Sequence, residues 1–340
     1  MSAPIAHGGG ITAAAAAFGG APEDWLDLST GINPCPVALP EIPARVWHRL
    51  PDRHVFDEAR RAARDYYGSR EILPLPVPGT QSAIQLLPRL LAEDRQAVVA
   101  DHRVAVVAPT YGEYVRAFAS AGLAVDTVGD IAAIGEEHRL AVVVNPNNPD
   151  GRAWPAERLI ALHDKMKSQN GLLVVDEAFG DPDPALSLAS HAQELPHLVI
   201  FRSFGKFFGL AGLRLGFVIA RGDILQRFEE WLGPWAVSGP ALSLAASLLR
   251  QDVSAIRGRI EERSAGLQAV LAASGLRIAG GAALFTLVAD PRAGKIYTHL
   301  CRHHILVRKF DYAPDWLRFG LTPDPAADRR LGEALQSFER

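Results

Sequence analysis

One lysine of this chain has the surroundings expected of a residue that forms a covalent bond with an aldehyde. Lys206 lies in the glycine-rich run SFGKFFGLAGLRLG, with Ser203 three residues before it and Arg214 eight residues after it. An amine attacks an aldehyde only when it has lost its proton, and desolvation or a nearby cation lowers the pKa of a lysine enough to allow this. Serine and arginine side chains bind phosphate. The run therefore predicts a lysine that binds a phosphorylated aldehyde cofactor, the alternative being a solvated lysine in a glycine-rich loop.

A second candidate phosphate site precedes an apolar helical run. Gly79, Thr80 and Gln81 form a turn at the start of the helix that we expect over residues 81–91. The first turn of a helix exposes unpaired N–H groups at the positive end of the helix dipole, where phosphate binds. A plain helix cap is the alternative for this turn taken alone. With the serine and arginine of the lysine run, the turn predicts a three-sided phosphate cup.

An acidic pair follows an apolar strand-like run. Asp176 and Glu177 come directly after residues 172–175. A carboxylate in this position can pair with a protonated pyridine nitrogen and keep the ring cationic, so that the ring withdraws electrons. A helix cap or a Mg²⁺ ligand of a nucleotide enzyme are the alternatives. The second is disfavoured because the chain contains no G-x-x-x-x-G-K-[ST] loop.

Two further residues follow expected strands. Asn148 lies in the proline-rich turn NPNNPDG, which could present an amide to a phenolic oxygen, although turn chemistry alone also explains this composition. Tyr111 follows another strand and could stack on a planar cofactor or belong to the core.

The elements that must position these residues alternate along the middle of the chain. We expect strands at residues 104–108, 140–144, 172–175, 198–201 and 216–220, and helices at residues 81–91, 111–121, 156–167 and 224–232. This alternation is typical of an α/β fold with a mostly parallel sheet and flanking helices. Ligands of open α/β sheets bind outside the carboxyl ends of the strands, so the polar loops there should face a common crevice.

The pattern changes after about residue 235. A long helical region over residues 240–274 is followed by strand-like pieces at 283–288 and 305–309 and by a last helix at 324–340. We therefore expect a large domain over residues 40–235 and a smaller α+β domain built from residues 1–39 and 236–340.

Composition limits the classes of function. A net charge of −3 over 340 residues gives no electrostatic case for a nucleic acid or an anionic membrane partner. No apolar run reaches the roughly 20 residues of a membrane helix, and the alanine run at residues 13–17 has no basic segment before it, so we expect neither a membrane span nor a signal peptide. Cys35 and Cys301 are far apart, and a strand would put His303 and His304 on opposite faces, so no metal site is expected. Free thiols indicate a cytoplasmic location.

The ordered set of these motifs resembles the fold type I pyridoxal-phosphate enzymes of the aminotransferase class over nearly the whole chain. The resemblance implies their α/β fold and pyridoxal 5'-phosphate (PLP) as cofactor. Lys206 would bind the cofactor aldehyde, Asp176 would pair with the pyridinium nitrogen, Asn148 would donate to the ring oxygen O3', and Tyr111 would stack on the ring. The residues implied for the cofactor phosphate are Gly79, Thr80, Gln81, Ser203 and Arg214.

Within this class, the chain most resembles the branch that decarboxylates L-threonine O-3-phosphate to (R)-1-amino-2-propanol O-2-phosphate in cobalamin biosynthesis. The resemblance rests on HGGG at residues 7–10, DLSTGINP at 27–34, Phe179 in place of the tyrosine of most aminotransferases, and GPWAV at 233–237. The branch that transaminates histidinol phosphate is the alternative, and a non-catalytic regulator with this fold is a second one.

The same branch implies the residues that bind the substrate. Arg308 and Arg318 match its two arginines for the anionic groups of the substrate, with surface salt bridges as the alternative. His7, Asn33 and Asn148 are implied as further substrate ligands, and we add Arg152 because it directly follows the NPNNPDG turn. Lys206, once released from the cofactor, would protonate Cα after CO₂ has left.

The chain departs from the family pattern at two positions. Leu50 stands where relatives usually have a tyrosine that reaches the cofactor phosphate of the neighbouring subunit, and Asp150 replaces the usual threonine. The resemblance implies a homodimer, whose contact at residue 50 must differ from that of the relatives.

Overall fold

The computed structural model describes residues 7–92 and 103–338 and divides into two compact units. Unit 1 consists of Met1–Pro36, Asn148–Arg152 and Val253–Arg340, and unit 2 of Val37–Asn147 and Ala153–Asp252. We expected the larger domain to end at residue 235. Unit 2 instead continues to Asp252, because α9 (Gly239–Leu248) packs against α3 (Arg53–Tyr67). Residues 1–6 and 339–340 of the expected small domain lie outside the described residues.

Unit 2 contains a seven-stranded sheet with the order β2-β8-β7-β6-β5-β3-β4. The pairs from β4 to β7 are parallel, whereas β8 pairs antiparallel with both β7 and β2. The mostly parallel sheet that we predicted is therefore present. Its strands are β2 (Leu75–Val77), β3 (Arg103–Val107), β4 (Ala124–Val128), β5 (His138–Val144), β6 (Leu172–Asp176), β7 (Leu198–Ser203) and β8 (Gly216–Ala220).

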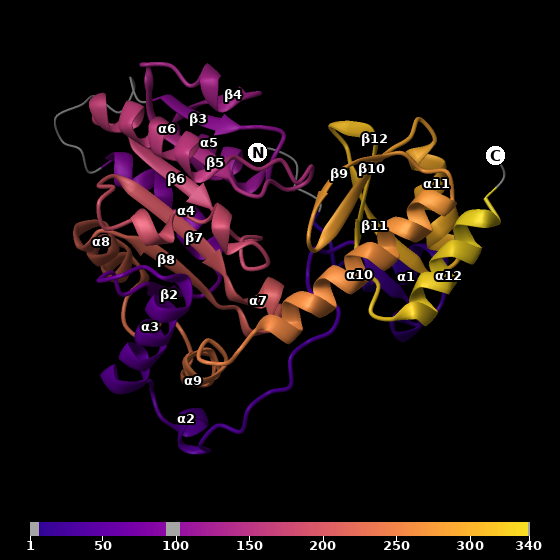
Figure 1. Ribbon diagram of the computed structural model, residues 1–340, viewed down its shortest axis with the longest axis horizontal. Coiled ribbons are helices and arrows are strands. Elements are labelled where there is room, and N and C mark those ends of the chain that lie inside the picture. Colours follow the sequence, from indigo (N-terminus) through magenta and orange to yellow (C-terminus); the bar gives the residue numbers. More distant parts are fainter. Residues whose placement is uncertain (1–6, 93–102, 339–340) are drawn as a thin grey trace. The chain divides into compact units, whose positions relative to one another are not determined.

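Helices cover this sheet because its central strands carry buried apolar runs, such as residues 140–144, 172–175 and 198–201. Figure 1 shows the strands side by side from β4 to β2, with α4 and α5 among the helices packed along them. Val142, Val174 and Phe201 are fully buried in this core. The helices of the unit, besides α3 and α9, are α2 (Arg45–His48), α4 (Thr80–Ala92), α5 (Glu113–Ser120), α6 (Ala156–Ser168), α7 (Phe204–Phe207) and α8 (Gly222–Leu232).

Unit 1 contains a five-stranded sheet with the order β1-β11-β12-β10-β9. Only the pairing of β1 with β11 is parallel. The strands are β1 (Leu26–Leu28), β9 (Ile278–Ala282), β10 (Phe285–Ala289), β11 (Ile305–Phe310) and β12 (Ala313–Gly320). Among the described residues of this unit, the α-helices are α1 (Ile11–Phe18), α10 (Ser254–Ala273), α11 (Ala293–Arg302) and α12 (Pro325–Gln336). This is the small α+β arrangement that we expected.

The helical region that we expected over residues 240–274 consists of two helices, α9 and α10, separated by the polar stretch around Arg250. One local expectation was wrong. Cys301 lies in helix α11 and not on a strand. Short 3-10 helices occur at Pro22–Asp24, Ile131–Ala133, Pro184–Leu186, Ala189–His191 and Ala211–Leu213. Within residues 7–92 and 103–338, no helix combines the length and the apolar character that crossing a bilayer requires.

Candidate active site

Residues of the predicted phosphate cup lie together in unit 2 where α4 begins. Gly79 has a φ of +74°, and a Cβ placed on it would lie 2.9 Å from Nη2 of Arg214. A side chain at this position would be strained by the backbone and would displace the guanidinium. Thr80 is the first residue of α4. The structure therefore places an arginine cation beside the amino end of a 13-residue helix.

Ser203 lies close to Thr80 because Gly216, its partner on the neighbouring strand, contacts Thr80. It is the last residue of β7 and pairs with Gly216 of β8. A Cβ on Gly216 would lie 2.9 Å from the backbone oxygen of Arg202 and 3.0 Å from both Cγ2 and the backbone nitrogen of Thr80, so a side chain here would push against the start of α4. Four of the predicted phosphate ligands thus gather at one place, namely Gly79, Thr80, Ser203 and Arg214.

Gln81, the fifth predicted phosphate ligand, has its side chain engaged elsewhere. Its amide nitrogen donates to Oε2 of Glu113 at 2.9 Å, and its amide oxygen accepts from the hydroxyl of Tyr111 at 3.0 Å. Gln81 could therefore bind the cofactor phosphate only through its backbone N–H, which has no intrahelical acceptor in the first turn.

Asp176 is a buried carboxylate at the carboxyl end of β6, with 4% of its surface exposed. Its Oδ2 accepts from the hydroxyl of Tyr114 at 2.7 Å, and its Oδ1 accepts from the backbone N–H of Ala178 at 3.0 Å. Burial raises the pKa of Asp176, while the Tyr114 hydroxyl and the charge of Lys206 act in the opposite direction. The carboxylate is therefore held in one orientation from two sides.

Lys206 lies in the short helix α7, which directly follows β7. Phe204 and Phe207 of the same helix are buried, whereas Lys206 is half-buried. Its Nζ lies 5.0 Å from the centre of the Phe179 ring. Phe179 follows Asp176 by three residues, so the lysine and the carboxylate border the same part of unit 2.

The residues next to Asp176 and Ser203 in the chain take part in a buried ion network. Arg202 donates to Glu177 at 2.7 Å and to Asp181 at 3.1 Å, and the side chains of all three are at most 3% exposed. Glu177 and Arg202 are the chain neighbours of Asp176 and Ser203. We predicted no role for Arg202 or for Tyr114. One sequence signal existed for each: Arg202 directly precedes Ser203, and Tyr114 follows Tyr111 by three residues.

Arg308 and Arg318 of unit 1 lie directly opposite each other on β11 and β12. Nη2 of Arg318 donates to the backbone oxygen of Ser29 at 2.9 Å, and Nη1 donates to Oδ1 of Asn148. Burial lowers the pKa of Arg318 to about 10, and the charge of Arg308 adds to this effect. Arg318 is 7% exposed, so it is a buried cation and not the surface salt bridge of the alternative interpretation.

The first described residues are fixed to Ser29. The hydroxyl of Ser29 accepts from the backbone N–H of Gly9 at 2.7 Å and donates to Asp27 at 2.6 Å. A cavity of about 530 Å³ in unit 1 is lined by His7, Ser29 and Arg308. Lys309 and Tyr312, which we did not predict, also line it. This part of unit 1 therefore offers several cationic or hydrogen-bonding groups to an anion.

The remaining two substrate candidates are held by local turns. Oδ1 of Asn33, which is 3% exposed, accepts from the backbone N–H of Cys35 at 2.9 Å. Arg152 is half-buried, and its backbone N–H donates to Asp150 at 3.0 Å. All six predicted substrate ligands belong to unit 1, and the predicted cofactor ligands other than Asn148 belong to unit 2.

Residues 23–335 match the sequence model of a family described as aminotransferase class I and II. The chain belongs to this family. Among its relatives, the chain is 60% identical over 339 residues to the threonine-phosphate decarboxylase of Sinorhizobium sp, covering 100% of both chains. It is 42% identical to the threonine-phosphate decarboxylase of Pseudomonas aeruginosa, covering 98% of both. Identity to the histidinol-phosphate aminotransferase of Cronobacter sakazakii is 30%, over 76% of this chain and 72% of that protein.

Solved structures of the aminotransferase family share the fold. The histidinol-phosphate aminotransferase of Sinorhizobium meliloti, in complex with pyridoxal-5'-phosphate, has a TM-score of 0.79 at 22% identity and covers 98% of this chain and 95% of its own. The L-threonine-O-3-phosphate decarboxylase of Porphyromonas gingivalis has a TM-score of 0.70 at 17% identity and covers 91% of this chain and 98% of its own. The predicted resemblance to the aminotransferase class, and with it the α/β fold, is confirmed.

Proposed function

We propose that this protein is a PLP-dependent carboxy-lyase. It would convert L-threonine O-3-phosphate to CO₂ and (R)-1-amino-2-propanol O-2-phosphate for cobalamin biosynthesis. The observation that carries the proposal is the 60% identity to a threonine-phosphate decarboxylase over the whole chain. The similarity to histidinol-phosphate aminotransferases is lower and covers about three quarters of the chain.

The residues of unit 2 fit PLP. The cradle at Gly79, with the Arg214 guanidinium beside the start of α4, suits a phosphate dianion. The buried carboxylate of Asp176 suits a protonated ring nitrogen, and Lys206 supplies an amine. Bound PLP withdraws electrons from Cα of an amino acid, so that a bond at Cα can break.

The candidate cofactor ligands divide into groups with separate tasks in this proposal. Gly79, Thr80 and Gln81 would bind the cofactor phosphate through backbone N–H groups, and Ser203 and Arg214 through their side chains. Asp176 would keep the ring nitrogen protonated, which maintains the electron withdrawal. Tyr111 would cover one face of the ring, and Asn148 would donate to the ring oxygen O3'.

The proposed substrate ligands would decide which bond at Cα breaks. Arg308 and Arg318 would bind the anionic groups of the substrate and orient its carboxylate for release as CO₂. His7, Asn33 and Arg152 would add donors to the substrate phosphate. When CO₂ leaves, the bonding electron pair stays with Cα, and Nζ of Lys206 would donate a proton to this carbon. Aminopropanol phosphate is the product of that protonation.

The test is to mix the PLP-loaded protein with L-threonine O-3-phosphate and to measure CO₂ and aminopropanol phosphate. Stoichiometric formation of both is expected, with loss of both in Lys206→Ala and retention in the control Lys167→Ala. Amino-group exchange between histidinol phosphate and 2-oxoglutarate without CO₂ would establish the aminotransferase instead. Bound PLP with neither reaction would favour a non-catalytic regulator.

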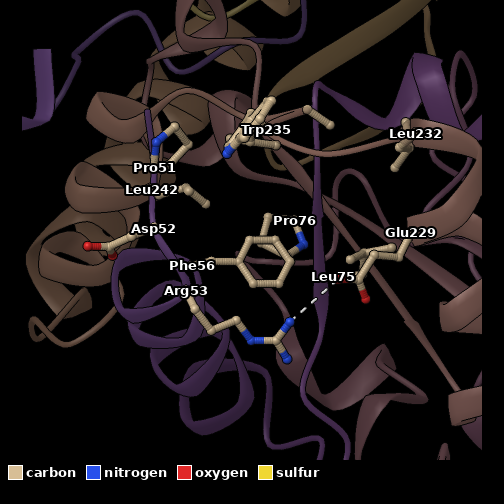
Figure 2. Close-up of a pocket in the computed structure, with 12 residues that line it drawn as sticks. Pro51, Asp52, Arg53, Phe56, Leu75, Pro76, Glu229, Leu232, Trp235 and Leu242 are labelled. Atoms are coloured by element: carbon tan, nitrogen blue, oxygen red, sulfur yellow. Dashed lines mark ion pairs between the residues drawn. The ribbon is translucent and has the colours of Figure 1, made fainter. Parts of the chain in front are cut away.

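We further propose that the protein is a homodimer. Leu39, Trp47, Leu50 and Trp235 of unit 2 are between 59% and 65% exposed. Trp235 and Phe56 line a hollow of about 160 Å³, and Arg53 and Glu229 of the same lining form an ion pair at 3.8 Å. Figure 2 shows these side chains around the hollow. A second hollow, lined by Leu50, shares Pro51 and Asp52 with the first. Large exposed apolar side chains around hollows are typical of protein interfaces, and a second copy of the chain is the proposed partner.

A cytoplasmic location is also part of the proposal. Both cysteines are free thiols: Cys35 donates to the backbone oxygen of Pro323 at 3.2 Å, and Cys301 is buried in α11. Free thiols persist in reducing compartments.

A further inference from the structure

The first turn of α5 contains a buried tyrosine that contacts the carboxylate of Asp176. Tyr114 is 0% exposed, and its hydroxyl donates to Oδ2 of Asp176 at 2.7 Å. The second carboxylate oxygen accepts from the backbone N–H of Ala178 at 3.0 Å. A carboxylate oxygen has two acceptor positions, so both oxygens retain capacity for a further donor.

The charges around Asp176 make this hydrogen bond important. Burial is the largest influence on the carboxyl group and raises its pKa. The Tyr114 hydroxyl, Lys206 of α7 and Arg202 of β7 favour the ionised form, together with the backbone N–H of Ala178. A hydrogen bond to an ionised carboxylate stabilises that form directly.

Tyr114 remains a donor throughout the working pH range. Burial and the neighbouring Asp176 raise the pKa of its hydroxyl well above the usual value. The preceding residue, Glu113, accepts from Gln81 at the start of α4 at 2.9 Å. The ring of Tyr111 meets the ring of Tyr114 edge-on at 6.4 Å. One turn of α5 therefore connects the phosphate cup, the ring-stacking tyrosine and Asp176.

We propose that Tyr114 is a positioning residue that keeps Asp176 ionised and oriented toward the ring nitrogen of the cofactor. This inference rests on the proposed binding of PLP. Tyr114 would act through Asp176 without touching the cofactor or the substrate. Its loss should therefore change how cofactor binding depends on pH.

The variant Tyr114→Phe removes the hydroxyl and retains the ring. Without this donor the pKa of Asp176 rises, so a higher pH is needed to ionise the carboxylate. A hydrogen bond to a charged group is equivalent to about one to two pKa units. We expect the pH below which the apoprotein loses affinity for PLP to rise by about one unit or more, with a roughly tenfold weaker Kd per unit below the midpoint. Absorbance titration with PLP from pH 5 to 9 measures this shift without any substrate.

Two comparisons separate this role from a structural one. Tyr297→Phe removes the same atom from a half-buried tyrosine of α11 in unit 1, and its pH profile should match the wild type. In an Asp176→Asn background, Tyr114→Phe should cause no additional pH shift, because the titrating group is gone. An unchanged profile in Tyr114→Phe, or an equal shift in the Asp176→Asn background, overturns the role of Tyr114. Failure of the wild type to bind PLP at all would overturn the proposed function and this inference with it.

Discussion

Arg308 and Arg318 form a directly opposed pair of like charges on the neighbouring strands β11 and β12. Like charges in this position destabilise a sheet. The cost falls on Arg318, which is buried and whose pKa is lowered to about 10. This pKa still leaves the guanidinium protonated at neutral pH. Two cations held together at a cost to stability are suited to a substrate that carries both a carboxylate and a phosphate.

Replacing one of these cations should therefore reduce substrate binding without reducing stability. Arg308→Met keeps an apolar side chain next to the Phe310 ring, which lies 5.5 Å from the guanidinium carbon. We expect the KM for L-threonine O-3-phosphate to rise about 10- to 100-fold, since a hydrogen bond to a charged group contributes about 1.5–3 kcal/mol. The free energy of unfolding of the apoprotein should be no lower than that of the wild type. Steady-state kinetics and urea unfolding measure the two quantities.

The control for this prediction is Arg302→Met, which removes an exposed charge at the end of α11. Its KM should equal that of the wild type. An unchanged KM in Arg308→Met would show that Arg308 does not bind the substrate.

Replacing Arg202 should instead reduce stability strongly, because its buried ion pairs with Glu177 and Asp181 would be lost. Arg202→Met leaves Glu177 and Asp181 buried without their cation. We expect the free energy of unfolding to fall by about 3–5 kcal/mol at neutral pH. Arg158→Met, which breaks an exposed pair with Asp130 at 3.8 Å, should cost less than about 1 kcal/mol.

The pH dependence of this loss has a definite sign. Burial already raises the pKa of Glu177, and the Arg202 charge opposes this effect. Without Arg202 the pKa of Glu177 in the folded state rises further above its unfolded value. Such a carboxyl group favours folding when protonated and loses this contribution as the pH rises. Urea unfolding should therefore show a larger loss at pH 8 than at pH 5; an equal loss at both would contradict an electrostatic cause.

The proposed dimer can be tested by its mass in solution. Light scattering should give about twice the 36.7 kDa of the chain. Trp47→Glu places a charge at one of the exposed apolar side chains and should give the mass of one chain. Ile278→Glu, at an exposed apolar position of β9 in unit 1, should leave the mass unchanged. A wild-type protein with the mass of one chain would rule out the dimer.

Local sequence was sufficient to propose candidate residues that lie beside a recognisable strand or helix end. Asp176 ends the apolar strand β6, Lys206 lies three residues after β7, and the glycine turn before Thr80 marks a helix start. Tyr114 and Arg202 were missed because their partners Asp176 and Glu177 lie 62 and 25 residues away, so that only the sheet brings them together. The break between α9 and α10 was missed because leucine and alanine recur at helical spacing on both sides of it.

The phosphate cup allows a prediction that depends on a single methyl group. Gly79→Ala would introduce a Cβ at a φ of +74° and 2.9 Å from Nη2 of Arg214. The strain and the displaced guanidinium should weaken PLP binding by about tenfold or more, which corresponds to about 1–2 kcal/mol. Gly212→Ala is the matched control, because a Cβ there meets no atom within 4 Å and its φ is not positive. Titration of both apoproteins with PLP measures the difference. If Gly79→Ala binds PLP as tightly as Gly212→Ala, Arg214 and the start of α4 do not hold the cofactor phosphate.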